Sequence, residues 1–118
     1  SGIELLVGAR NDNQYGPILI IGAGGGMVEL LKDVAIRLLP VREDDIHKML
    51  AELHISSMFG GFRGNEPADT DALIAGIQGF SEFFLDHRTW ISDIEINPLM
   101  VRPKGQGICA VDIRTVHY

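Results

Sequence analysis

The sequence predicts an α+β domain in which helices cover one face of a mainly antiparallel sheet. Segments with strand-like patterns open and close the chain, and two segments with helical spacing lie between them. Short loops of turn-forming residues join neighbouring strand-like segments, which is typical of antiparallel hairpins. At 118 residues the chain has the size of one domain, so we expect residues 1–118 to form a single unit. Because the chain starts at Ser1 without an initiator methionine, we expect a piece of a longer protein.

The first part of the chain predicts a hairpin followed by a third strand. Residues 3–10 and 17–22 are short apolar runs rich in β-branched side chains, and the residues between them are polar turn formers. Residues 22–26 form a glycine-rich loop that is too flexible for the interior of a helix or strand. Residues 34–41 have the pattern of a third strand.

The middle of the chain predicts two helices. Residues 43–45 are three acids, which stabilise the start of a helix through its dipole. The apolar face of this helix has the spacing i, i+3, i+4, i+7 and consists of Ile46, Met49, Leu50 and Leu53. A longer helix is capped by Asp69 or Thr70. Its apolar face consists of Leu73, Ile77, Phe80 and Phe84.

Composition and charge exclude several classes of function. The net charge of −6 makes a nucleic-acid backbone an unsuitable partner. The longest apolar run, residues 17–23, is too short to span a bilayer. The single cysteine, Cys109, excludes an internal disulfide and a cysteine-based zinc site, and it suits a reducing compartment. We therefore expect a soluble cytoplasmic protein that binds neither nucleic acid nor membrane.

The last hairpin carries the most informative polar pattern. Residues 90–101 and 107–116 alternate like strands around a turn at residues 103–106. On one face of this hairpin lie Asp93, Glu95 and Asn97 from the first strand and Ala110, Asp112 and Arg114 from the second. The other face of the second strand is apolar and consists of Cys109, Val111 and Ile113. We expect Cys109 to lie in the core. A two-residue loop at residues 104–105 places Asn97 directly opposite Asp112 and Glu95 opposite Arg114. A loop at residues 105–106 makes these pairs diagonal but keeps them on one face.

Paired side chains on this face suit a metal ion. Directly opposed residues have Cβ atoms about 5 Å apart, so the oxygens of Asn97 and Asp112 can bind one ion. A small number of hard oxygen ligands favours Mg²⁺, which completes its shell with water and substrate phosphates. The alternative is a strand break at residues 97–98 with ordinary polar surface residues beyond it.

Two further positions are candidates for ligand binding. Gly24 and Gly25 lie in a glycine loop after a strand, where the backbone can approach a phosphate, but the loop matches neither the dinucleotide-binding nor the P-loop pattern. A tight turn without a ligand is the simpler interpretation of this loop. Arg63, between glycines, is suited to hold an anion, and its alternative is a solvated surface arginine.

These motifs resemble those of a known family. The run Asp-Ile-Glu-Ile-Asn-Pro-Leu at residues 93–99, together with residues 110–114, is similar to the carboxy-terminal part of the ATP-grasp domain of ADP-forming acyl-CoA synthetases, relatives of the succinyl-CoA synthetase β subunit. Three other pieces match the same family in the same order: its opening hairpin (residues 2–8, with Asp12 and residues 16–17), the stretch after its glycine loop (residues 28–34) and the entry to its long helix (residues 62–64, before Pro67 and Asp69). The resemblance implies an ATP-grasp carboxy-terminal subdomain.

The resemblance also implies roles for individual residues. In such enzymes the asparagine of this motif and the aspartate about fifteen positions later bind the Mg²⁺ of ATP or ADP, and these are Asn97 and Asp112 here. Glu95 matches the motif glutamate, which is implicated in handling the phosphohistidine loop, and we expect it to be catalytic. The expected partners are the nucleotide and the CoA-binding and phosphohistidine domains or subunit of the same enzyme.

The implied reaction converts acyl-CoA, ADP and phosphate to the free acid, CoA and ATP through a phosphohistidine. We expect the 118-residue chain alone to be inactive, because the resemblance covers one of the two subdomains that close around the nucleotide. Two alternatives stay open. The chain could be the regulatory synthetase-like region of a protein lysine acetyltransferase, or a non-catalytic module that senses nucleotide or joins subunits.

Overall fold

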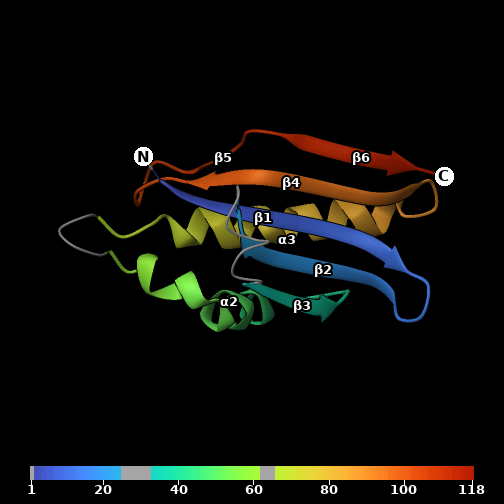
Figure 1. Ribbon diagram of the computed structural model, residues 1–118, viewed down its shortest axis with the longest axis horizontal. Coiled ribbons are helices and arrows are strands. Elements are labelled where there is room, and N and C mark those ends of the chain that lie inside the picture. The colour runs from blue at the N-terminus through green and yellow to red at the C-terminus, as the bar shows by residue number, and fades with distance from the viewer. Residues whose placement is uncertain (1, 25–32, 62–65) are drawn as a thin grey trace.

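One antiparallel sheet organises the chain. The computed structural model describes residues 2–24, 33–61 and 66–118. Within these residues the strand order is β3-β2-β1-β4-β5, and β6 also pairs with β4. The strands are β1 (Ile3–Asp12), β2 (Gly16–Ala23), β3 (Val34–Leu38), β4 (Ile91–Val101), β5 (Ile108–Ala110) and β6 (Ile113–His117), and the helices are α2 (Glu43–Glu52), the short 3₁₀ helix η1 (His54–Met58) and α3 (Thr70–His87). In Figure 1, α3 lies behind β1 and β4, and α2 lies near β3. The predicted α+β class is confirmed.

The first hairpin is held by its own turn. β1 and β2 pair from Leu5↔Ala23 to Asp12↔Gly16, so both strands extend beyond the predicted limits and the turn shortens to residues 13–15. Asp12 Oδ1 accepts the backbone N–H groups of Gln14 and Tyr15, each at 2.9 Å. These two bonds, led by that from Tyr15, lower the pKa of Asp12 below its ordinary value. Gly16 has φ +85°, a conformation that glycine adopts readily.

The core lies between the sheet and the two helices. The odd-numbered residues of β1 face it and pair with inward residues of β2, as Leu5↔Ala23 and Val7↔Ile21. The predicted apolar face of α2 is buried, with all four residues at 5% exposure or less. On α3, Leu73, Ile77 and Phe84 are buried as predicted, whereas Phe80 is only partly buried. None of the described helices is long and apolar enough to cross a membrane.

The outer strand of the sheet differs from the prediction. Residues 107–116 were expected to form one strand, but β5 and β6 are separated at residues 111–112. The interruption lies opposite Pro98, which has no N–H to donate, and the pairing of β4 with β1 shifts by one residue between Leu99 and Ile96. β4 itself runs without a break through residues 97–98, so the strand break considered there as an alternative is wrong; the interruption lies in the facing segment, at residues 111–112.

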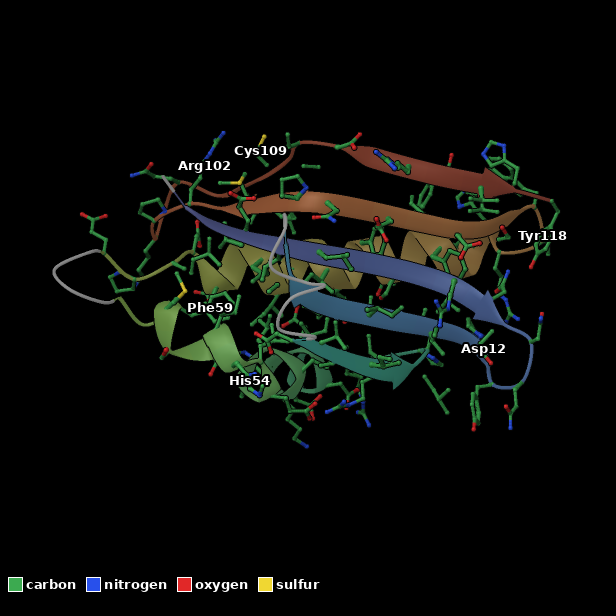
Figure 2. The ribbon with its side chains drawn as sticks, viewed as in Figure 1. Asp12, His54, Phe59, Arg102, Cys109 and Tyr118 are labelled. Atoms are coloured by element: carbon green, nitrogen blue, oxygen red, sulfur yellow. The ribbon has the colours of Figure 1, made fainter. Side chains whose placement is uncertain are left out.

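The expected apolar face of this outer strand is not in the core. Cys109 is half-buried, and Val111 and Ile113 are 61% and 54% exposed. Figure 2 shows Cys109 at the margin of the molecule, on the edge formed by β5 and β6. The alternation correctly assigns residues to two faces of the strand. At the edge of the sheet, however, few residues pack against either face, so the apolar face stays exposed.

Asp69 ties α3 to the last hairpin. It is the N-cap of α3, and its Oδ1 accepts the N–H of Ala72 at 3.3 Å. Its Oδ2 accepts the N–H groups of Gly105 (3.0 Å) and Gly107 (2.8 Å) from the turn between β4 and β5. The bond from Gly107 is the largest of the effects that lower the pKa of Asp69. One carboxylate therefore caps a helix and fixes a turn.

Two adjacent phenylalanines test where the core lies. Phe84 is fully buried, whereas Phe83 is 44% exposed. Replacement of Phe84 by Ala should lower the free energy of unfolding by about 3–5 kcal/mol, because it leaves a cavity between helix and sheet. Phe83→Ala, the matched control, should change it by less than about 1 kcal/mol. Urea denaturation measures both, and equal effects would contradict this assignment of the core.

The acid dependence of stability tests the Asp69 link. Because folding lowers the pKa of Asp69, its contribution is complete above the ordinary value of 3.8 and is lost as the pH falls through the lower, folded value. Asp69→Asn should reduce the thermal midpoint at pH 7 by about 5 °C. The difference from the unaltered chain should shrink as the pH drops below about 4.

The control for this experiment is Asp71→Asn. It removes an acid from the same first turn of α3 but not the bonds to the hairpin turn. A pH-independent loss of stability in Asp69→Asn, or an equal loss in Asp71→Asn, would show that the link does not depend on the carboxylate of Asp69.

Candidate functional site

The last hairpin has the register that places the polar residues face to face. Pro103 O accepts the N–H of Gln106 at 2.9 Å, so residues 104–105 form a two-residue loop. Glu95 pairs with Arg114, and the Asn97 N–H donates to Asp112 O at 3.0 Å. Of the two registers that the sequence left open, the structure has the direct pairing and not the diagonal one.

The four paired residues line one hollow. Glu95, Asn97, Asp112 and Arg114 surround a space of about 110 Å³. Glu95 lies between Ile94, which is in the core, and Ile96, which packs against it, so its side chain is on the sheet face opposite the helices. The hollow opens to solvent, since the side chains of Asp112 and Arg114 are 52% and 80% exposed. We refer to it below as the polar hollow.

An ion pair occupies one side of the polar hollow. Arg114 Nε lies 3.4 Å from Asp112 Oδ2. This distance is longer than a strong N–H···O bond, and exposed pairs of this kind contribute little to stability. Glu95 and Asp112 bring two negative charges and Arg114 one positive charge, so the hollow carries one net negative charge. Such a site attracts cations rather than anions.

The donor atoms fit a hard cation. Asp112 offers carboxylate oxygens, Glu95 offers two more at the rim, and Asn97 carries an amide oxygen. Within the described part of the chain no three His, Cys, Asp or Glu side chains gather, so these residues form no complete cage. Mg²⁺ suits such an arrangement, because it binds through one or two carboxylates and keeps water and phosphate oxygens as its other ligands.

Arg114 is the functional candidate that the sequence pattern did not single out. Its place opposite Glu95 followed from the register, but nothing in its type or spacing separated it from a surface arginine. Its ion pair with Asp112 and its place in the wall of the polar hollow now do so.

The glycine loop is described only at its start. Gly24 is buried and donates its N–H to Glu4 O at 2.9 Å. A Cβ atom there would lie 2.7 Å from the carbonyl carbon of Leu5, so packing against β1 already requires glycine. A ligand contact by Gly24 stays a prediction. Gly25 and Arg63 lie outside the described residues, and their predicted roles stay predictions too.

A larger hollow lies at the start of α3, apart from the polar hollow. It has a volume of about 420 Å³, and its lining includes Phe59, Asp69 and Lys104. Figure 2 places Phe59 beside η1, on the helical side of the molecule. Both carboxylate oxygens of Asp69 accept backbone N–H groups, so the residue already serves as the N-cap of α3 in this hollow.

Relatives of known activity match nearly the whole chain. The β subunit of ADP-forming acetate–CoA ligase II from Pyrococcus furiosus is 36% identical over 115 residues, which are 98% of this chain and 49% of that subunit. The ADP-forming 4-hydroxybutyrate–CoA ligase of Nitrosopumilus maritimus is 34% identical over 96% of this chain and 16% of its own length. The chain thus spans half or less of these relatives.

A solved structure shares the fold. The dinucleotide-forming acetyl-coenzyme A synthetase 1 of Candidatus Korarchaeum cryptofilum, in complex with coenzyme A and Mg-AMPPCP, superposes with a TM-score of 0.92 at 34% identity. The match covers 100% of this chain and 54% of that one.

The predicted resemblance to ADP-forming acyl-CoA synthetases is therefore confirmed by relatives that are enzymes of this type. The profile described as the ATP-grasp domain matches residues 1–116. The chain belongs to the ATP-grasp domain family.

Proposed function

We propose that the chain is the magnesium-nucleotide-binding half of an ADP-forming acyl-CoA synthetase. The reaction of the whole enzyme would convert acyl-CoA, ADP and phosphate to the acid, CoA and ATP. The observation that carries the proposal is the polar hollow, where Asn97, Asp112 and Glu95 converge on the exposed face of the sheet. Relatives named as ADP-forming ligases support a synthetase over the regulatory and non-catalytic alternatives.

Asn97 and Asp112 would hold the Mg²⁺ of the nucleotide. The bound ion supplies positive charge that neutralises phosphate oxygens during phosphoryl transfer. The chain's own contribution is position: a two-residue turn and a direct backbone hydrogen bond fix Asn97 on β4 opposite Asp112, which lies between β5 and β6. Preorganised ligands of this kind lower the cost of ordering the phosphates.

Glu95 would face the phosphoryl donor. It is exposed at the rim of the polar hollow, two residues from Asn97 on β4. In the proposed reaction the N–P bond of a phosphohistidine breaks and an O–P bond forms to ADP. A carboxylate at this place can accept a hydrogen bond from the histidine ring and orient it. The phosphohistidine would come from another domain or subunit; in the Korarchaeum synthetase, a phosphohistidine segment points towards the nucleotide binding site of that protein.

The metal ligands can be tested in the complete enzyme. Asp112→Ala should lower Mg²⁺-dependent turnover by at least about 100-fold, because it removes a charged ligand. Asn97→Ala should have a smaller effect, about tenfold, because the amide is neutral. Asp86→Ala, which removes an exposed acid from α3, is the control and should leave turnover unchanged. Unaltered kcat and Mg²⁺ dependence in both hollow variants would refute the assignment.

The 118-residue chain should fold without catalysing. Its core is formed within the described residues, but it spans 49% of the Pyrococcus β subunit and carries one wall of the proposed nucleotide site. Mg-ATP should therefore bind with millimolar affinity, about −4 kcal/mol. Calorimetric titration of the purified chain and an assay of acyl-CoA synthesis test the two parts. Micromolar affinity or measurable turnover would show that the chain is a complete catalytic unit.

A further inference from the structure

Arg114 pairs with a carboxylate that a metal ion in the polar hollow would also need. Its Nε is 3.4 Å from Asp112 Oδ2, one of the oxygens that a cation in the polar hollow would need. Its side chain is 80% exposed, so little protein packing holds it in this position. The guanidinium bears five N–H donors, which match phosphate oxygens in pairs.

We propose that Arg114 is a built-in counter-ion that exchanges partners when the metal–nucleotide complex binds. Without metal it neutralises Asp112. When the cation takes the Asp112 carboxylate, Arg114 turns to a phosphate of the nucleotide. This inference rests on the proposed function, because it takes Asp112 as the metal ligand, and it adds a phosphate-binding residue to the site.

The charges of the polar hollow favour this exchange. The positive charge of Arg114 beside Asp112 repels a divalent cation, so Arg114 weakens the binding of the free metal ion. A metal–nucleotide complex brings phosphate oxygens to the same place and gives the guanidinium a new partner. The pair at 3.4 Å is exposed and loosely held, so breaking it costs little. Arg114 should thus discriminate between free cation and cation bound to nucleotide.

Opposite effects of one substitution provide the test. In the purified chain, Mn²⁺ serves as the probe for the cation, since it shares the oxygen ligands of Mg²⁺. Arg114→Ala should bind Mn²⁺ about threefold more tightly, measured by electron paramagnetic resonance of the free ion. The same variant should bind ADP in the presence of Mg²⁺ about tenfold more weakly, measured by NMR titration. A structural role for Arg114 would weaken both or neither.

Two further variants make the result specific. Arg114→Lys keeps the positive charge but cannot donate two parallel hydrogen bonds to a phosphate as a guanidinium does. It should therefore retain the Mn²⁺ affinity of the unaltered chain and lose part of the ADP affinity. Arg102→Ala removes the same charge at the far end of β4, near the turn, where Figure 2 labels it beside Cys109. It should change neither affinity by more than about twofold.

Asp112→Asn separates the inference from the proposed function. If this variant binds Mn²⁺ as well as the unaltered chain, the metal site itself is wrong. If Asp112→Asn loses Mn²⁺ but Arg114→Ala fails to tighten Mn²⁺ and weaken Mg-ADP, the metal site stands and the exchange by Arg114 is wrong. Circular dichroism verifies that each variant is folded, and the exposed position of β6 makes its substitutions tolerable to the core.

Discussion

The register of the last hairpin determines where every polar group of the candidate site lies. A slip of one residue would move the side chains of a strand to its other face, and a loop at residues 105–106 would make the pairs diagonal. Only the observed register places Asn97 directly opposite Asp112. Two features fix it: the two-residue loop at residues 104–105, and Asp69, whose carboxylate accepts the N–H groups of Gly105 and Gly107. Because Asp69 also caps α3, the position of the hairpin depends on the helix that builds the core.

One face of the sheet forms the core, and the other carries the candidate site. One face packs against α2 and α3 and contains the buried residues of β1 and β2. The other face carries the polar hollow, formed by β4, β6 and Asp112 just before β6, and an exposed apolar row on β3 formed by Val34, Ile36 and Leu38. Substitutions in the polar hollow therefore remove chemistry without opening a cavity, which makes binding measurements on variants interpretable.

The sequence predicted the two α-helices, the first hairpin and the placement of Asn97 and Asp112 on one face, because periodicity determines these directly. It left open whether the two residues pair directly or diagonally, since the position of the turn was not determined. It did not predict the interruption between β5 and β6. Alternation assumes a regular ladder, whereas Pro98 cannot donate a hydrogen bond and the pairing shifts beside it. Nor could alternation show that Val111 and Ile113 are exposed, since a pattern separates two faces without revealing what covers them. Arg114 was not singled out, because its proposed role depends on the short distance between its side chain and that of Asp112, which the sequence pattern does not give.

The open position of the polar hollow explains why the proposed half-site should bind its cation weakly. Asp112 and Arg114 are 52% and 80% exposed, so water screens their charges and the attraction for a cation is small. The same groups would interact far more strongly in a space from which water is excluded. The relatives are at least about twice as long as this chain, and the wall that excludes water from the hollow would have to come from outside the matched residues. In the proposed nucleotide site, affinity would thus depend on closure of the hollow as well as on the ligands that this chain supplies.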